Sequence, residues 1–416
     1  MSRVANMSSG RALDPLEGPA VARPAGGAAC NPDGPGTPLR CPAVLRVAAD
    51  LTALLDARSG IGVFVAEMVG ELADRPDMAL TGFAVTWRGW GDLPKVVPPS
   101  VATVGWPMAA RPLREAWTRS DHPRVDRWIG RHDVVWGPNF VLPPSRAAGV
   151  ATVHDLTPLR FPQLANPATL VYPALIRRAL ARGATIHTPS HFVRDEVIDH
   201  FGAPPERVVA IHLGITPTPA VPGGEARARA LAGGDRYLLA VGTVEPRKDL
   251  PTLVAAFDAL AADDPALRLV IAGGDGWGAE ALTASIAAAR HHDRVVRLGW
   301  VEDADRDALL RGATVYCYPS VYEGFGLPPL EAMSAGVPVV ATRAGAIPEV
   351  CGDAAVLVDV GDADALGAAL ARVLGDEPYR DALVARGAAQ VAGFSWRTTC
   401  ADFAALLHQV AASHGG

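Results

Sequence analysis

The hydrophobic positions of this chain follow two periods that alternate from about residue 44 to the C-terminal end. Short continuous apolar runs, typical of buried strands, are followed by stretches whose apolar residues recur every three to four positions, as on one face of a helix. We expect strands at residues 44–48, 79–85, 133–136, 150–153, 185–190 and 208–211, and then at 237–242, 267–272, 295–298 and 315–320. Strands that alternate with helices in this way predict an α/β fold with parallel sheets.

Two breaks in the pattern indicate how the chain is organised. Residues 1–42 are rich in glycine and proline and show little periodicity, so we expect a disordered leader or a start codon assigned too far upstream. Residues 216–224 are rich in proline and mark a boundary between two domains. The predicted organisation is a leader at 1–42, a first domain at 43–218, a linker at 219–234, a second domain at 235–394, and a final helix with its tail at 395–416.

The composition is that of a folded protein with a sizeable core, because hydrophobic residues make up 49% of the chain and charged residues 20%. The five cysteines are odd in number and lack metal-ligand spacing, which favours a reducing compartment without a disulfide framework. No apolar run reaches the ~18 residues of a membrane-spanning helix, and the N-terminus lacks the basic-then-apolar order of a signal peptide. We therefore expect a cytoplasmic protein.

The most distinctive segment covers residues 323–342, where two glycines and two prolines lead into a short predicted helix that ends at Gly336. The N–H groups at the start of such a helix form a ready anion site. The flanking carboxylates of Glu323 and Glu331 can accept hydrogen bonds from hydroxyl groups. Taken alone, the two glutamates would more simply be a loop charge and a charge near a helix start. Together with the glycines and prolines, they indicate a ligand in which phosphate adjoins a sugar.

The same segment reads Glu-Gly-Phe-Gly-Leu-Pro-(x)2-Glu-Ala-Met-(x)2-Gly-x-Pro-Val-Val. This pattern resembles the nucleotide-sugar loop of retaining glycosyltransferases, the large family that includes bacterial mannosyltransferases and sucrose synthases. The resemblance covers about residues 44–410 and is strongest over 237–358. It implies the GT-B fold, with two facing Rossmann-like domains and a last helix that crosses back to the first domain. It also implies an enzyme of the family 4 type whose donor is a nucleotide diphosphate sugar, with no other cofactor and no metal.

Within this loop the resemblance assigns a run of neighbouring residues, and the carboxylate of the following helix, to the donor. These residues are Glu323, Gly324, Phe325, Gly326, Leu327 and Glu331. Glu323 is expected to hydrogen-bond the sugar hydroxyls, and it is therefore also a candidate catalytic residue.

Cations and turns elsewhere in the second domain complete the expected donor site. Arg247 and Lys248 follow a predicted strand and precede a helix. Such a pair is usually part of a solvated loop, but at the ligand edge of a parallel sheet two fixed cations suit a diphosphate. Related enzymes hold the phosphates with cations at this place, and many have a further arginine where this chain has Thr243. The resemblance also assigns the glycine turn at Gly273 to the donor and nucleobase recognition to Val301.

The first domain is expected to contribute residues from the opposite side of the donor. His154-Asp155 directly follows a predicted strand, and ligands of open α/β sheets bind beyond the carboxyl ends of strands. A lone histidine is more often structural, but in the resembling family this histidine contacts the donor sugar near its anomeric carbon. Asp155 could orient His154 or bind an acceptor hydroxyl, and both roles stay open. Gly60 and Gly62 open a predicted helix that runs through Ala73. The resemblance places the two glycines opposite the donor diphosphate and the acceptor.

Two Asp-x-Asp pairs, Asp303 with Asp305 and Asp362 with Asp364, superficially look like metal ligands. Each pair begins a predicted helix, where a carboxylate is favoured without any metal. We therefore expect structural capping at both places and assign no metal site.

Charge is unevenly distributed along the chain. The formal net charge is −6, yet residues 111–182 contain eleven arginines against five acidic residues. A solvated arginine surface explains part of this excess. The remainder would suit a lipid-diphosphate acceptor or peripheral contact with an anionic membrane at the inner face of the plasma membrane. No nucleic-acid motif accompanies the arginines, so nucleic acid is not an expected partner.

These features predict transfer of a hexose, with retention, to a hydroxyl of a glycan, glycolipid or lipid-linked saccharide. Mannose from GDP-mannose ranks only slightly above glucose from UDP-glucose or ADP-glucose, and the acceptor and linkage are left open. Two alternatives remain: a nucleotide-sugar 2-epimerase, whose family usually lacks this loop, and a catalytically silent partner subunit. The joint presence of His154, Arg247, Lys248, Glu323 and Glu331 argues against a silent subunit.

Overall fold

The computed structural model describes residues 44–55 and 60–414, and these residues hold two parallel sheets. The expected leader at 1–42 lies outside the described residues, so its disorder stays a prediction. In the first sheet the strands pair in the order β3-β2-β1-β4-β5-β6-β7, and every pairing is parallel. The bounds are β1 (Leu45–Asp50), β2 (Met78–Phe83), β3 (Ala102–Val104), β4 (Val134–Gly137), β5 (Ala148–Thr152), β6 (Thr185–Thr188) and β7 (Val208–Ala210).

Both faces of the first sheet are buried, because its strands point apolar side chains to either side. In β1, Val47 joins one core cluster and Ala48 joins another. The first cluster contains side chains of α1, which buries Phe64, Met68 and Leu72 at four-residue spacing. The helices that accompany this sheet are α1 (Gly60–Ala73), α2 (Leu93–Val96), α3 (Ala110–Arg119), α4 (Asp126–Ile129), α5 (Thr157–Arg160), α6 (Tyr172–Ala181) and α7 (His191–Phe201).

The prolines around tryptophans 87, 90, 106 and 117 predict one irregular stretch, and the charge period after it predicts a helix near 121–132. The structure differs from both expectations. Trp117 lies in α3, is fully buried, and donates from Nε1 to the carbonyl of Pro123 at 3.0 Å. The chain turns at residues 120–125, so α4 covers only one turn. Burial of a large indole from the amphipathic α3 explains the difference, because packing decides where a short helix forms. Trp87 and Trp106 stay exposed.

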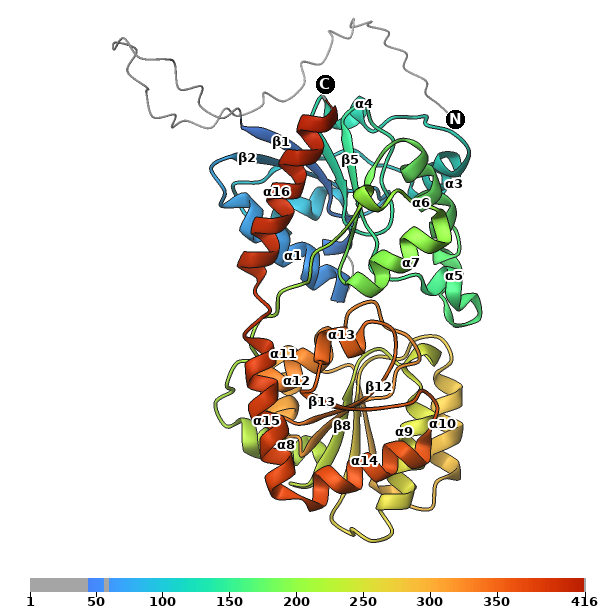
Figure 1. The fold of residues 1–416 in the computed structure, drawn as a ribbon, viewed down its shortest axis with the longest axis vertical. Coiled ribbons are helices and arrows are strands. Elements are labelled where there is room, and N and C mark those ends of the chain that lie inside the picture. The colour runs from blue at the N-terminus through green and yellow to red at the C-terminus, as the bar shows by residue number, and fades with distance from the viewer. Residues whose placement is uncertain (1–43, 56–59, 415–416) are drawn as a thin grey trace, which may run out of the picture. The chain divides into compact units, whose positions relative to one another are not determined.

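The second sheet has the order β10-β9-β8-β11-β12-β13 and is also parallel throughout. Its strands are β8 (Tyr237–Val241), β9 (Arg268–Ala272), β10 (Val295–Gly299), β11 (Val315–Tyr318), β12 (Val339–Thr342) and β13 (Ala355–Val358). Its helices are α8 (Gly224–Ala232), α9 (Leu250–Leu260), α10 (Ala279–Ala288), α11 (Asp303–Gly312), α12 (Leu327–Ser334), α13 (Ile347–Cys351), α14 (Ala363–Gly375) and α15 (Glu377–Val391). The two sheets and the helices around them can be followed in Figure 1.

The predicted linker at 219–234 is only partly a connection, because residues 224–232 form α8. The small side chains of Ala228 and Ala232 are buried, and α8 packs against α11. Alanine-rich helices of this kind bury little surface and leave a weak periodic signal, which is why the sequence pattern did not separate α8 from the linker. The exact domain boundaries stay a prediction.

The last helix, α16 (Trp396–His414), returns to the first sheet, as the resemblance implied. Its buried residues include Trp396, Cys400, Phe403 and Leu407, which recur every three to four positions. The Phe403 ring lies 4.8 Å from the ring of Trp136 in β4, centroid to centroid. In Figure 1, α16 is the red helix beside the first sheet, where it contacts β4 and β5. This contact joins the C-terminal end of the chain to the first sheet.

A buried hydrogen-bond chain runs through the core beneath α16. Trp136 Nε1 donates to Thr152 Oγ1 at 3.0 Å, and Thr152 Oγ1 lies 3.1 Å from Nδ1 of His187. His187 Nε2 lies 3.3 Å from the carbonyl oxygen of Ile211, which can only accept. The proton is therefore on Nε2. Burial lowers the pKa of His187 to about 3, which keeps the ring neutral at physiological pH.

We expect folding stability to fall as the pH is lowered through the range in which the unfolded His187 takes up a proton. The pKa of His187 is lower in the folded protein than its unfolded value of about 6.5. The stability that the neutral ring contributes is therefore fully present above about pH 6.5 and is lost below it. Between about pH 7 and pH 5 the loss should reach about 2 kcal/mol of unfolding free energy. Denaturant titrations at several pH values measure it. His187→Gln, which can keep both hydrogen bonds without titrating, should show a smaller pH dependence; an unchanged slope would contradict the assignment.

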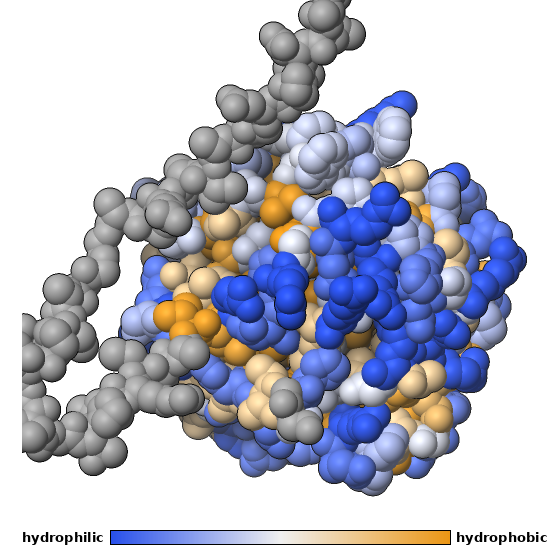
Figure 2. All heavy atoms as spheres, turned by 90° about the horizontal axis from the view of Figure 1, so that it is seen from above, coloured by the Kyte–Doolittle hydropathy of each residue, from blue (hydrophilic) through white to orange (hydrophobic). Residues whose placement is uncertain are grey.

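No helix in the described residues is long and apolar enough to cross a membrane. The face shown in Figure 2 carries a broad area of hydrophilic side chains, and its hydrophobic side chains lie in smaller groups between them.

Candidate active site

The candidate site lies at the carboxyl ends of the strands of the second sheet, where the loops after β8, β9 and β11 meet. Gly242 and Gly273, which end two of these strands, touch so closely that a Cβ on Gly273 would lie 1.9 Å from the Gly242 carbonyl oxygen. Gly273 has φ +151°, a conformation that favours glycine. This contact explains why residue 273 is glycine, and its predicted role in donor binding stays a prediction.

Arg247, Lys248 and Glu323 form one buried ion-pair cluster. Arg247 Nη1 lies 2.7 Å from Oε2 of Glu323, and Lys248 Nζ lies 2.7 Å from Oε1. The exposed side-chain fractions are 17% for Arg247, 14% for Lys248 and 9% for Glu323, so water screens these charges only weakly. The sequence treated the two cations as diphosphate ligands, and the structure adds that they hold the candidate catalytic carboxylate.

Burial and the neighbouring charges together shift the pKa values of the three residues in this cluster. For Glu323, burial acts to raise the pKa, but the adjacent Arg247 and Lys248 outweigh it and lower the value to about 2. For Lys248, burial is the largest effect and lowers the pKa in spite of the attraction of Glu323. For Arg247, burial acts to lower the pKa, but Glu323 and Glu245 outweigh it and raise the value. Glu323 is therefore held as a carboxylate.

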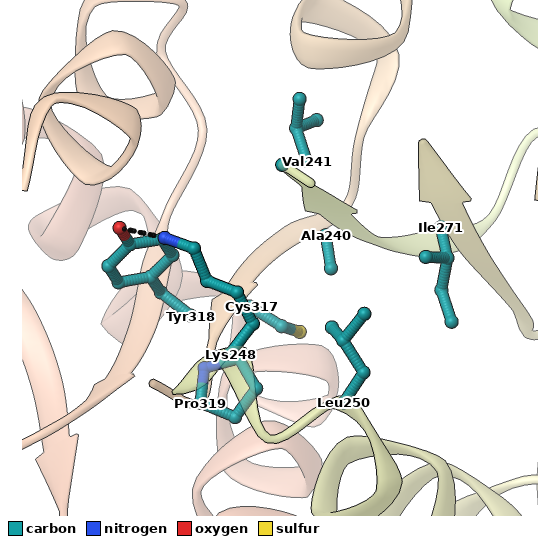
Figure 3. Close-up of a pocket in the computed structure, with 9 residues that line it drawn as sticks. Ala240, Val241, Lys248, Leu250, Ile271, Cys317, Tyr318 and Pro319 are labelled. Carbon is teal, nitrogen blue, oxygen red and sulfur yellow. Dashed lines mark hydrogen bonds between the residues drawn. The ribbon is translucent and has the colours of Figure 1, made fainter. Parts of the chain in front are cut away.

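Two tyrosines and a further glutamate surround the cluster, and the sequence prediction did not single them out. Arg247 Nη2 donates to Glu245 at 2.6 Å, and Nη1 donates to the backbone carbonyl of Tyr322 at 2.8 Å. Lys248 Nζ donates to the Tyr318 hydroxyl at 2.8 Å, and this contact borders the small pocket drawn in Figure 3. Tyr318 and Tyr322 lie shortly before Glu323 in the sequence, which is the one signal that could have identified them.

The loop that follows β11 turns sharply into α12. Gly326 has φ +120°, and Leu327, Pro328 and Pro329 are the first residues of the helix. Proline carries no backbone N–H, so Leu327 is the only one of these three residues with such a group, and the anion site at this helix start stays a prediction. Leu327 and Glu331 are half-buried, and the Glu331 carbonyl accepts from Thr218 Oγ1 at 3.1 Å. The donor roles of Gly326, Leu327 and Glu331 stay predictions.

Gly324 and Phe325 carry contacts between the two halves of the protein. A Cβ on Gly324 would lie 1.8 Å from the His154 carbonyl oxygen, and Ser190 Oγ donates to the Gly324 carbonyl at 2.8 Å. The ring of the buried Phe325 lies 6.0 Å from that of His212, centroid to centroid. Phe325 therefore packs against an element of the first half, a position that the sequence motif did not reveal.

His154 is held between two aromatic rings, with ring centroids 5.1 Å from Phe64 and 5.6 Å from Phe140. Its Nε2 lies 2.7 Å from the carbonyl oxygen of Pro138, which can only accept, so the proton is on Nε2. Burial lowers the pKa of His154 and keeps the ring neutral. Nδ1 is then the nitrogen with a lone pair, able to accept a hydrogen bond from a hydroxyl group.

Asp155 is used locally, since its Oδ1 accepts from the backbone N–H of Thr157 at 2.8 Å at the start of α5. Within the described residues, no hydrogen bond joins Asp155 to the His154 ring, and both predicted roles of Asp155 stay predictions. Gly60 is the first residue of α1, Gly62 is buried in its first turn, and Val301 follows β10 and is half-buried. Their donor contacts stay predictions.

A second cluster joins the loop of Glu323 to the loop of His154 and Asp155. The Tyr322 hydroxyl accepts from the backbone N–H of Leu156 at 2.9 Å and donates to Glu196. Glu196 in turn accepts from Arg160 at 2.8 Å. The two loops that carry the candidate catalytic residues are thereby positioned by one buried tyrosine.

The expected capping is found at one of the two Asp-x-Asp pairs, that of Asp362, whereas α11, which begins at Asp303, has no side-chain cap. Asp362 accepts from the backbone N–H of Ala365 at 2.8 Å and caps α14, as predicted. Asp305 pairs with Arg227, and Asp303 lies 3.5 Å from Arg306. A helix cap therefore accounts for Asp362, and ion pairs account for Asp303 and Asp305.

Comparison with known proteins agrees with this architecture. Residues 58–218 match the family described as Glycosyltransferase Family 4, and residues 225–390 match Glycosyl transferases group 1. The chain is 35% identical over 287 residues to O-antigen chain mannosyltransferase B of Escherichia coli, covering 66% of this chain and 74% of that protein. It is 36% identical over 239 residues to the D-inositol 3-phosphate glycosyltransferase of Salinispora tropica, covering 53% of this chain and 49% of that protein. It therefore spans about half the length of this second relative.

Among solved structures, the chain resembles sucrose-phosphate synthase from Thermosynechococcus elongatus, with a TM-score of 0.70 over 89% of this chain and 100% of that chain. The sequence identity is 20%, so this likeness concerns the fold alone. Two parallel α/β sheets and a last helix that returns to the first sheet define a GT-B protein. The chain belongs to the family 4 glycosyltransferases, whose group 1 description matches its second half, and it is a hexosyltransferase enzyme.

Proposed function

We propose that the protein transfers mannose from GDP-mannose, with retention, to a hydroxyl of a glycan or lipid-linked saccharide. The observation that carries the proposal is the buried cluster of Arg247, Lys248 and Glu323 at the start of α12, which offers cations for a diphosphate and a carboxylate for sugar hydroxyls. The choice of mannose is supported by the identity with a mannosyltransferase of Escherichia coli.

The ion pairs suggest how the donor is recognised. Two cations face two carboxylates, Glu245 and Glu323, so the cluster is balanced in charge. A donor diphosphate would compete with Glu323 for Arg247 and Lys248, because both are charge-assisted hydrogen-bond donors of the kind that phosphates bind. Glu323 would then accept hydrogen bonds from sugar hydroxyls instead. The exchange would couple phosphate binding to placement of the sugar.

The proposed chemistry is front-face displacement. The bond between the anomeric carbon and the phosphate oxygen breaks, the acceptor oxygen bonds to the same carbon from the same face, and the acceptor proton passes to the leaving phosphate. Arg247, Lys248 and the N–H groups at the start of α12 stabilise the negative charge that develops on that phosphate. His154 accepts a hydrogen bond from the donor sugar through Nδ1, so catalysis depends on contact between the two halves.

The proposal for the acceptor rests on the arginines among residues 111–182. Part of the arginine excess is used within the first half, since Arg178 and Arg182 pair with Asp121, and Arg160 pairs with Glu196. We propose that exposed arginines such as Arg111 and Arg131 favour an anionic acceptor or contact with an anionic membrane surface.

The test of the function is a donor panel followed by product analysis. Melting curves with GDP-mannose, UDP-glucose and ADP-glucose show which donor stabilises the fold. Turnover with saccharide acceptors and NMR of the product then give the sugar and its anomeric configuration. Stabilisation by GDP-mannose and an α-mannoside product are expected. A product of inverted configuration would refute retention, and preference for a glucose donor would refute the choice of mannose.

Lys248→Ala is expected to raise the donor Kd about tenfold or more, because a hydrogen bond to a charged group contributes ~1.5–3 kcal/mol. Calorimetric titration with nucleoside diphosphate measures it. The chain has two lysines, and Lys95, an exposed residue paired with Asp92, supplies a matched control in Lys95→Ala. Equal donor affinity in both variants would remove Lys248 from the donor site.

Turnover is expected to survive thorough treatment with a chelator. Arg247 and Lys248 are fixed where the diphosphate is proposed to lie, and fixed cations can take the place of a metal in stabilising phosphate charge. The measurement compares kcat before and after chelation and after addition of Mg2+ or Mn2+. Activity that disappears with the chelator and returns with Mg2+ or Mn2+ would contradict a metal-independent transfer.

A further inference from the structure

A group of metal-ligating side chains lies outside the donor cluster. It consists of His191, the first residue of α7, His212, which follows β7, and Glu349 in α13. One ligand atom from each residue lies within 4.8 Å of the others. His212 Nε2 is 2.6 Å from Glu349 Oε1, and the rings of His191 and His212 have centroids 5.7 Å apart. The group therefore joins elements that follow strands of the first sheet to a helix of the second.

Glu349 is fixed by the backbone. Its two carboxylate oxygens accept from the backbone N–H groups of His191 and Phe192, each at 2.9 Å. Both carboxylate oxygens are thus oriented by the backbone, next to His212 and at the start of α7.

The two histidines differ in how firmly they are held. The His212 ring packs against Phe325 and Phe394, and its carbonyl accepts from Thr399 Oγ1 at 2.7 Å. His191 is exposed, and within the described residues no hydrogen bond to its ring is found. Two ligands are therefore placed beforehand, and the third can rotate toward them.

We propose that His191, His212 and Glu349 bind one divalent cation of the Zn2+ class, which ties the two halves of the enzyme together. Two imidazoles and one carboxylate form a donor set that suits Zn2+, whereas Mg2+ and Ca2+ prefer oxygen ligands alone. On binding, Zn2+ takes the lone pair of His212 Nε2, and the proton that lay between Nε2 and Glu349 moves to Nδ1 of the same ring. Water completes the coordination.

This site is separate from the chemistry of transfer but close to its loop. The backbone N–H of Ala346, which precedes α13, donates to the Glu323 carbonyl at 2.9 Å. A cation that links α13 to α7 therefore steadies the loop of Glu323 through its backbone and touches neither the donor phosphates nor the sugar. The proposal does not depend on the identity of the sugar.

The experiment titrates Zn2+ into the full-length protein without an affinity tag, by calorimetry and by melting curves. We expect one ion per chain and a raised melting temperature. His191→Ala removes a ligand but keeps the backbone N–H that holds Glu349, and Glu349→Gln keeps the shape of the side chain without its charge. Each should weaken Zn2+ binding about tenfold or more. His292→Ala, at another exposed histidine, is the matched control and should bind as the wild type does.

Substitution by Co2+ adds a readout of coordination, because a site with imidazole ligands gives a visible absorption spectrum that His191→Ala should change. Wild-type affinity in both His191→Ala and Glu349→Gln would overturn the proposal. An equal loss in His292→Ala would do so as well, since it would show binding to surface histidines in general. Stabilisation by Mg2+ as strong as that by Zn2+ would contradict the assigned class of cation.

Discussion

Replacing Glu323 with alanine is expected to lower kcat by about 10²–10³-fold, the range seen when one preorganised electrostatic contact in a transition state is removed. Glu323 is buried and held by Arg247 and Lys248, each at 2.7 Å. Without the carboxylate, the donor sugar loses its proposed acceptor of hydrogen bonds, and the two cations lose the group that positions them. The effect should therefore appear in kcat and in donor affinity together.

The same substitution leaves two like charges buried side by side, so a loss of stability of about 3–5 kcal/mol is also expected. Glu323→Gln keeps the side-chain volume and separates the two effects, because it retains hydrogen bonding without the charge. Glu280→Ala, at an exposed position in α10, is a control that should leave kcat unchanged. Rates are compared well below each melting temperature, with the folded fraction checked by circular dichroism.

Intact-mass spectrometry during turnover tests the chemical role of Glu323. In front-face displacement no covalent intermediate forms, so a hexose bound to Glu323 should not be found. A trapped glycosyl-enzyme at this residue would refute the front-face mechanism and establish double displacement instead. A kcat of Glu323→Ala within about threefold of the wild type would remove Glu323 from the catalytic residues.

Replacing Gly324 with alanine is expected to lower kcat/KM about 10²-fold while the fold is kept. An added Cβ would lie 1.8 Å from the backbone carbonyl oxygen of His154, a distance that requires the backbone itself to move. The loop of Glu323 and the loop of His154 would separate, and a shift of about 1 Å in a reacting group costs about 10²-fold. In the proposed mechanism, Glu323 and His154 act on the same donor only while this contact between the halves is intact.

The matched control is Gly70→Ala in α1, where an added Cβ meets nothing within 4 Å. Alanine at that helical position should raise stability slightly, by up to ~1 kcal/mol, and leave turnover unchanged. Steady-state kinetics on both variants, with melting curves for each, make the comparison. Wild-type kcat/KM in Gly324→Ala would show that the contact with the His154 carbonyl is dispensable for transfer.

The sequence by itself determined the alternation of strands and helices over most of the chain, and the family. Apolar runs and helical periods are local properties of the chain, because a buried strand or an amphipathic helix needs apolar residues at fixed spacings whatever its partners are. This is why α1, predicted to open at Gly60 and to run through 73, has those bounds in the structure. The motif around Glu323 likewise identified a glycosyltransferase, which the comparisons confirm.

Local patterns failed where packing between distant segments decides the structure. Trp117 was expected in an irregular region because prolines surround it, but its burial stabilises α3. Residues 224–232 were expected in a linker because their alanines give a weak period, but they form α8 and pack on α11. In both cases the contact that stabilises the helix comes from residues far along the chain.

Only the tertiary structure decided how the candidate site residues are paired. The sequence placed Arg247, Lys248 and Glu323 at one ligand, but their mutual ion pairs join residues 75 and more positions apart. It left Asp155 with two roles, and the hydrogen bond to Thr157 directs this carboxylate to the start of α5. It gave no sign that Tyr322 and Glu196 position the two loops, or that Glu349 meets two histidines. Hydrogen bonds and ion pairs depend on distances of about 3 Å between particular atoms, and no periodicity along the chain records which distant atoms come that close.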